Sequence, residues 1–92
     1  MCGIIGCTGE LKAIDVLTGG LRALEYRGYD SAGIAFFNAD SNIVTVKASG
    51  KIKNLEDKLG IMNESEKASF CGIGHTRWAT HGEPTERNAH PH

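Results

Sequence analysis

The chain has 92 residues, which is enough for one small domain and too few for two. Ten Lys and Arg residues nearly balance eleven Asp and Glu residues, and the net charge of −1 argues against a nucleic-acid-binding or polybasic membrane surface. Its longest apolar run, residues 34–37, is far too short to cross a membrane. Three cysteines without a secretory signal indicate reduced thiols, so we expect a cytoplasmic protein.

The first part of the chain predicts a strand followed by a helix. Residues 3–8 are rich in glycine and β-branched residues, which favours a short strand. From residue 11 onward the apolar residues recur every three or four positions, as on one face of a helix: Ile14, Leu17, Leu21 and Leu24. Two glycines inside this pattern, Gly19 and Gly20, weaken the helix by about 1 kcal/mol each.

The rest of the chain predicts three strands and a second helix. In chain order these are a strand at 32–37, a polar hairpin loop at 38–42, a strand at 43–47, a helix from 52 to about 60 with Ser49 as its N-cap, a loop at 63–67 and a strand at 70–78. The resulting β-α-β-β-α-β order indicates the α+β class. We expect Cys7 and Cys71 to be packing residues in this fold.

Cys2 is the first candidate for chemistry, because methionine aminopeptidases remove Met1 when the second residue is small. An N-terminal cysteine combines a thiol with an α-amine that can accept the thiol proton, so one residue supplies both nucleophile and base. The alternative is a small buried cysteine with a packing role.

The segment from Gly74 to Gly82 is the second candidate. Strand alternation places His75, Arg77 and Ala79 on one face. An arginine at a strand end suits bidentate binding of a small carboxylate. The alternatives are a structural ion pair for the arginine and a core position for Trp78.

Other polar groups carry weaker signals. The turn at 26–31 contains Arg27 and Asp30, for which we favour helix termination and a local ion pair. The spacing of His75 and His81 only marginally fits a zinc site, and the chain has no glycine-rich phosphate-binding motif. We therefore expect neither a metal nor a cofactor.

Three segments, taken together, resemble one family: Met-Cys-Gly-Ile-Ile-Gly at 1–6, Leu-Glu-Tyr-Arg-Gly-Tyr-Asp-Ser-Ala-Gly at 24–33, and Gly-His-Thr-Arg-Trp-Ala-Thr-His-Gly-Glu-Pro-Thr at 74–85. They are similar to the N-terminal part of the class II glutamine amidotransferase domain. Within that class they resemble the glutaminase half of the glutamine–fructose-6-phosphate aminotransferases (isomerizing), or glucosamine-6-phosphate synthases. The resemblance covers essentially the whole chain.

The resemblance implies a fold and a mechanism. The fold would be α+β, an incomplete N-terminal part of a four-layer αββα N-terminal-nucleophile hydrolase sandwich. Cys2 would attack the side-chain amide of L-glutamine, releasing ammonia and forming a γ-glutamyl thioester that water hydrolyses to glutamate. Arg77 would bind the glutamine α-carboxylate, while Trp78, Thr80 and His81 would line the same pocket.

The resemblance also implies a longer parent protein. Its C-terminal sugar-isomerase domain would use the ammonia to convert fructose 6-phosphate into glucosamine 6-phosphate. The parent is expected to be a homodimer without nucleic-acid or membrane partners. Residues 1–92 would be a truncated portion, because the family's Asn-Gly oxyanion hole and amine-binding aspartate lie further along, so we expect little activity from them alone. The alternative is a non-catalytic module that binds glutamine or a partner.

Overall fold

The computed structural model describes residues 2–9, 12–25, 30–62, 69–78, 87 and 89–91. Its elements, in chain order, are β1 (Gly3–Thr8), α1 (Ala13–Leu24), β2 (Ser31–Phe37), β3 (Ile43–Ser49), α2 (Ile52–Gly60) and β4 (Cys71–Arg77). The predicted order of elements and the α+β class are confirmed, and most element ends agree to within two residues.

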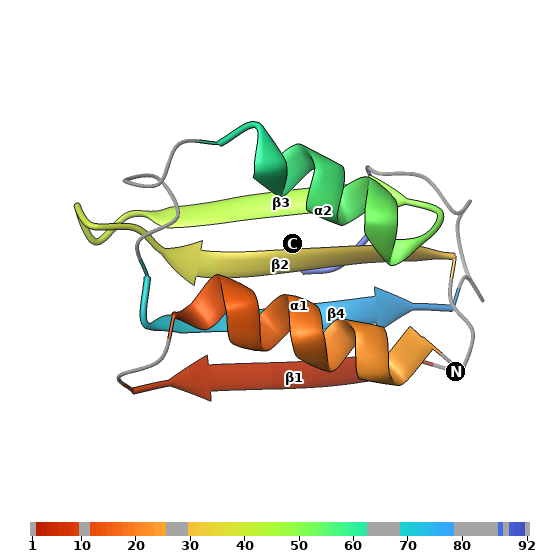
Figure 1. Cartoon of the computed structure of the whole chain (residues 1–92), viewed down its shortest axis with the longest axis horizontal. Helices are drawn as coiled ribbons and strands as arrows, with labels where there is room; N and C mark the ends of the chain where they lie inside the picture. Colours follow the sequence, from red (N-terminus) through yellow and green to blue (C-terminus); the bar gives the residue numbers. More distant parts are fainter. Residues whose placement is uncertain are drawn as a thin grey trace.

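The four strands form one sheet in the order β1-β4-β2-β3, with every neighbouring pair antiparallel (Figure 1). As a result, β1 and β2 run parallel to each other on either side of β4. Likewise, β3 and β4 run parallel on either side of β2. Each helix connects one of these parallel pairs, which is the usual role of a crossover helix. The last strand therefore lies between the first two.

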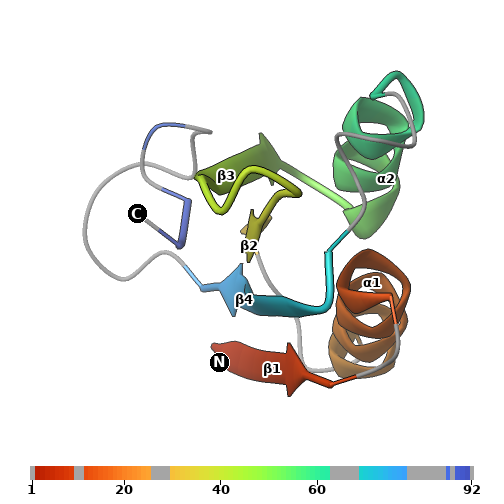
Figure 2. The ribbon, with the colours of Figure 1, turned by 90° about the vertical axis from the view of Figure 1, so that its left-hand side faces the viewer.

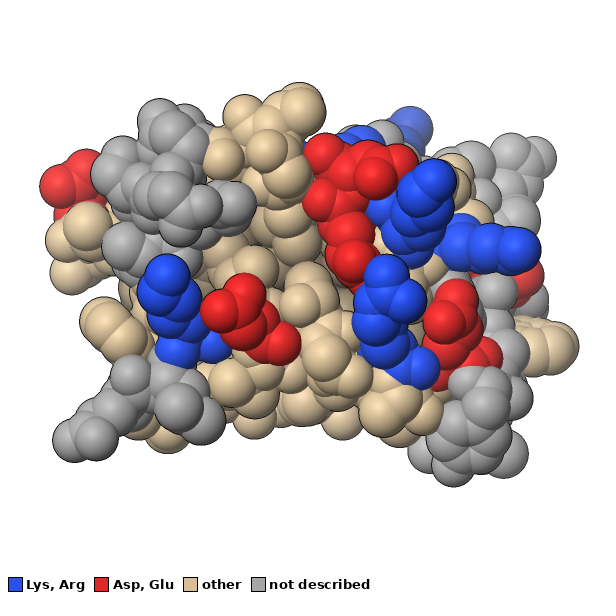
Figure 3. All heavy atoms as spheres, viewed as in Figure 1, with Lys and Arg blue, Asp and Glu red and all other residues tan. Residues whose placement is uncertain are grey.

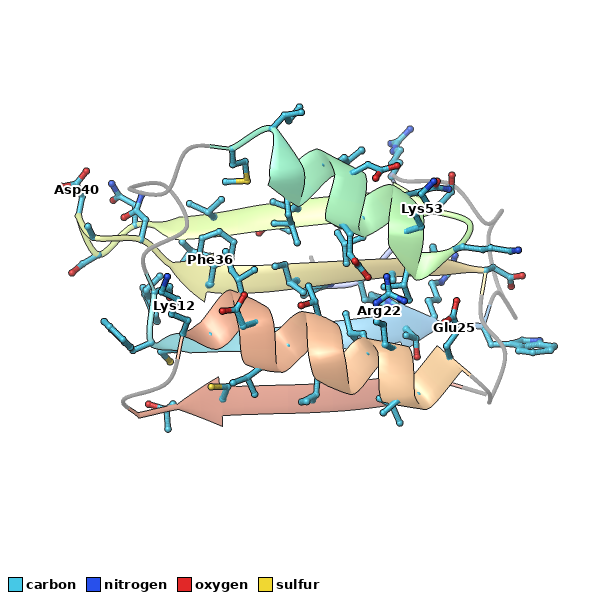
Figure 4. The ribbon with its side chains drawn as sticks, in the orientation of Figure 1. Lys12, Arg22, Glu25, Phe36, Asp40 and Lys53 are labelled. Atoms are coloured by element: carbon cyan, nitrogen blue, oxygen red, sulfur yellow. The ribbon has the colours of Figure 1, made fainter. Side chains whose placement is uncertain are left out.

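Both helices pack on the same face of the sheet, which we call the covered face (Figure 2). The largest fully buried apolar side chains lie between these two layers: Leu17, Leu21, Ile34, Phe36, Ile52 and Leu55. Figure 4 shows the Phe36 ring on β2 and the Arg22 side chain on α1. The predicted helical periodicity thus identified the side of α1 that faces the core.

A glycine inside α1 is explained by close packing against β1. A Cβ atom at Gly20 would collide with the side chain of Ile5, whereas the position of Gly19 is open. The helix consequently continues through both glycines, because one of them allows α1 to approach the sheet.

The outer surface of the helices carries charged side chains of both signs among uncharged ones (Figure 3). One ion pair joins the two helices, with Arg22 Nε at 2.6 Å from Glu56 Oε1. In the part of the chain that the structure describes, no helix has the length and hydropathy needed to span a membrane.

The prediction of Ser49 as the N-cap of α2 is wrong. Ser49 is the last residue of β3 and pairs with Ser31, so its backbone belongs to the sheet. Gly50 then turns the chain with a φ of 82° before the helix begins, and Lys51 occupies the N-cap position without a side-chain cap bond.

The opposite face of the sheet is not covered by the helices, and we call it the open face. It is formed by the alternate strand residues Ile4, Gly6, Thr8, Ser31, Gly33, Ala35, Phe37, Ile43, Thr45, Lys47, Ser49, Cys71, Ile73, His75 and Arg77. Several large apolar side chains there are exposed, among them Ile4 (76%) and Ile43 (68%). Cys71 is also exposed, so its predicted packing role is wrong, whereas Cys7 packs against the core of the covered face.

Candidate active site

Cys2 lies immediately before β1 and is exposed. Because Gly3 pairs with Thr76, Cys2 stands opposite the last residue of β4. The backbone N–H of Trp78 donates a hydrogen bond to Cys2 Sγ at 3.3 Å. This bond places the candidate nucleophile at the end of a strand that is 76 residues away in the sequence.

Arg77 is the last residue of β4 and is only 6% exposed. Ser31, opposite it on β2, is fully buried. The Arg77 carbonyl accepts a hydrogen bond from the Asp30 N–H at 2.7 Å, and the Asp30 carbonyl accepts one from the Gly50 N–H at 2.9 Å. These bonds fix the strand ends around the arginine, and Arg77 has further interactions with its surroundings. Carboxylate binding and a structural ion pair both fit this position.

Trp78 follows directly after β4 and is 47% exposed. The alternative of a core position for this residue is therefore wrong. Strand alternation would have pointed its side chain toward the covered face, but β4 ends at Arg77. Trp78 contacts Cys2 through its backbone N–H.

Part of the predicted site lies outside the described residues. Thr80 and His81, which were predicted to line the pocket, fall in this category, and so does Arg27. Their proposed roles stay predictions. Among the described residues, no three metal-ligating side chains lie close enough together to hold a metal ion.

His75 shares the open face with Arg77, as predicted from strand alternation. Its ring lies edge-on to that of His90, with centroids 4.7 Å apart and planes at 85°. Burial lowers the pKa of His75 below its ordinary value of 6.5, and the nearby His90 and Arg77 lower it further. A neutral imidazole is thus favoured beside the arginine.

Two features of this region could not be found by examining side-chain motifs. The Trp78 amide is a backbone group, so only the register of β1 against β4 brings it to Cys2. The contact between His75 and His90 depends on the path of the chain after β4, which has no local sequence pattern.

Comparison with known proteins finds close relatives across the full 92 residues. The chain is 56% identical to glutamine–fructose-6-phosphate aminotransferase (isomerizing) of Cyanidium caldarium, 54% identical to that of Clostridium perfringens and 48% identical to that of Mycolicibacterium paratuberculosis. All of the chain is covered in each case, but it spans only 14–15% of the length of these relatives. No protein-family model matches the chain.

These identities confirm the resemblance that the three sequence motifs indicate. Over its whole length, the chain is homologous to the N-terminal region of the glutamine–fructose-6-phosphate aminotransferases (isomerizing).

Proposed function

We propose that the chain is the nucleophile-bearing part of the glutaminase half of an enzyme that makes glucosamine 6-phosphate. The observation that carries this proposal is the hydrogen bond from the Trp78 N–H to Cys2 Sγ, which joins the candidate nucleophile to the strand ending in Arg77. The names of the relatives support glutamine and fructose 6-phosphate as the substrates.

The proposed reaction begins when removal of Met1 frees the α-amine of Cys2. This amine accepts the thiol proton, and the thiolate attacks the side-chain carbonyl carbon of glutamine. The carbon–nitrogen bond of the tetrahedral adduct then breaks, the nitrogen takes up the proton and leaves as ammonia, and a γ-glutamyl thioester remains. Water adds to the thioester, which releases glutamate and restores the thiol. The Trp78 N–H donates a hydrogen bond to Cys2 Sγ and so orients the sulfur at the end of β4.

Arg77 is the proposed anchor for the α-carboxylate of glutamine. A guanidinium can bind a carboxylate through two parallel hydrogen bonds, which fixes the orientation of the substrate as well as its position. The low exposure of Arg77 strengthens such an interaction, because little water screens it. In this proposal Trp78 covers the bound substrate, while Thr80 and His81, shortly after it in the sequence, complete the pocket.

We further propose that a longer polypeptide covers the open face and completes a four-layer αββα sandwich of the N-terminal-nucleophile hydrolase type. The exposed apolar side chains of Ile4, Ile43 and Ile73 support this, as does the much greater length of the relatives. The Asn-Gly oxyanion hole and the sugar-isomerase domain would come from that polypeptide, which we place in the cytoplasm as a homodimer. Loss of one oxyanion donor costs about 10²–10³ in rate, so little activity is expected from residues 1–92 alone.

A chimeric enzyme tests this proposal directly. This chain would replace the matching N-terminal segment of the Clostridium perfringens relative, to which it is 54% identical. Glutamate release would be measured with and without fructose 6-phosphate. We expect turnover by the chimera and its loss in Cys2→Ala. Retained turnover in Cys2→Ala would rule out the proposed nucleophile, and glutamine binding without turnover would favour the non-catalytic module.

A second pair of variants tests the carboxylate anchor. In the same chimera, Arg77→Lys keeps the charge but removes the two-pronged hydrogen bonding, so KM for glutamine should rise about tenfold or more. Arg22→Lys is the matched control, because Arg22 is on the outer side of α1 and pairs with Glu56. An unchanged KM in Arg77→Lys would favour the alternative interpretation, in which Arg77 makes a structural ion pair.

A further inference from the structure

The C-terminal segment, residues 89–91, lies against the open face of the sheet. Figure 2 shows the chain passing on the side of the sheet opposite to the helices. Ala89 is fully buried and Pro91 is buried as well. The neighbouring Arg87 carbonyl accepts a hydrogen bond from Lys47 Nζ at 3.5 Å. The segment is therefore packed on the sheet.

Gly33 provides the space in which this segment lies. A Cβ atom at this position would collide with the carbonyl oxygen of His90 and would come within 3.0 Å of Lys47 Cγ. The backbone of the segment thus passes directly over the middle of β2. Only a residue without a side chain permits so close an approach.

His75 supplies the side-chain contact that holds the segment. It pairs with Gly33 across the sheet, and its ring meets the edge of the His90 ring. Within the described part of the molecule, the buried Nδ1 atom of His75 has no hydrogen-bond partner. The two rings pack edge to face, and protons on both rings would place two like charges 4.7 Å apart.

The charged and titratable groups facing His75 in the described residues come from three elements. They are Arg77 on β4, Lys47 on β3 and His90 in the C-terminal segment. Uncharged residues pair with His75 from β1 and β2. Each of the three groups is positive when protonated, so a proton on His75 adds a like charge to this region.

We propose that the contact between His75 and His90 is an acid-released latch, which holds residues 89–91 on the open face near neutral pH and releases them when the histidines take up protons. Because the pKa of His75 is lowered in the packed state, the packing is fully stabilised above pH 6.5 and is lost as the pH falls through the lowered pKa. Release linked to one proton changes the open-to-closed ratio by at most about tenfold per pH unit, and to two protons by about a hundredfold.

The latch lies beside the proposed catalytic region. His75 is two residues from Arg77 on the same face, so its protonation also changes the charge near the proposed carboxylate anchor. This consequence rests on the proposed function, whereas the latch itself does not. An experiment without glutamine therefore tests the latch alone. It can overturn the latch while the proposed function stands, and failure of the proposed function leaves the latch unaffected.

Nuclear magnetic resonance of the full 92-residue chain tests the latch. The readouts are the nuclear Overhauser effect between the His75 and His90 rings and the amide shift of Gly33, followed from about pH 7.5 to about pH 5. We expect the ring contact at the higher pH and its loss at the lower pH. Gly33→Ala provides the reference for a displaced segment at both pH values. Absence of the ring contact near pH 7.5, or its persistence near pH 5, would overturn the proposal.

His75→Phe is the decisive variant, because phenylalanine keeps an aromatic edge contact and cannot take up a proton. We expect a smaller pH dependence of the Gly33 shift than in the unmodified chain, because the change of charge at residue 75 is removed. An unchanged pH dependence would contradict the assigned role of His75. Should this variant not fold, the His75 titration in the unmodified chain decides: a pKa at or above 6.5 rules the latch out.

Discussion

The two faces of the sheet are built from alternate residues of the same four strands, yet they differ in chemistry. The covered face is aliphatic and aromatic, and its interior residues such as Ile34 and Phe36 are almost fully buried under the helices. The open face carries Arg77, His75 and exposed apolar side chains. Stability therefore comes mainly from one face, while the groups capable of chemistry gather at the other.

The largest expected difference in stability is between alanine substitutions of two adjacent phenylalanines. Phe36→Ala should lower the free energy of unfolding by about 3–5 kcal/mol, because it leaves a cavity under the helices. Phe37→Ala changes the next residue, which is 45% exposed on the open face, and should cost less than about 1 kcal/mol. Urea denaturation of both variants measures the difference. Equal costs would mean that the open face is as well packed as the covered one.

A smaller effect is expected at two glycines of the open face. Gly33→Ala should destabilise the fold by about 1–3 kcal/mol, because its new Cβ meets the His90 backbone. Gly6→Ala faces open space and should be neutral or stabilise by up to about 1 kcal/mol. Thermal unfolding of the two variants gives the comparison. A harmless Gly33→Ala would show that residues 89–91 do not pack where the structure places them.

On the covered side, alanine substitutions at the two glycines of α1 should differ by about 1 kcal/mol in their effect on the free energy of unfolding. Gly19→Ala should stabilise the fold by up to about 1 kcal/mol, since alanine is the better helix former and its Cβ is unobstructed. In Gly20→Ala the same gain is offset, because the Ile5 side chain must move. Chemical denaturation distinguishes the two. The close contact between α1 and β1 would be in doubt if both substitutions stabilised equally.

The smallest effect concerns the outer surface of the helices. The ion pair of Arg22 and Glu56 is partly exposed to solvent and should contribute less than about 1 kcal/mol. A double-mutant cycle with Arg22→Ala and Glu56→Ala measures this coupling at low and high salt. We expect it to decrease as salt is added, because ions screen surface charges. A large coupling that salt leaves unchanged would indicate a desolvated pair.

Local patterns predicted the elements well, because the helices have a clear apolar periodicity and most strands are rich in apolar or β-branched residues. The hairpin between β2 and β3 is one example: the polar loop at 38–42 is held by the Asn38 side chain, whose Oδ1 accepts the N–H groups of Asp40 and Asn42 at 3.0 Å. The prediction for Ser49 failed because strand pairing with Ser31 continued past the point where β-branched residues end. Pairing depends on the partner strand, which the local sequence does not specify.

The candidate site was predictable only in part. Cys2 and Arg77 could be selected by their chemistry and by resemblance, and the register of β1 with β4 brings them to one place. The Trp78 amide, Gly33 and His90 could not be selected, because their roles arise from backbone approach between distant segments. The roles of Thr80 and His81 stay predictions.

The position of β4 between β1 and β2 also has a consequence for synthesis on the ribosome. In the described sheet β1 is hydrogen-bonded only to β4, which is among the last segments of these 92 residues to be made. Until β4 emerges, the strand behind Cys2 has no partner, and the N-terminus stays accessible to the aminopeptidase that would remove Met1. The chain order thus allows the nucleophile to be unmasked before the strands that position it come together.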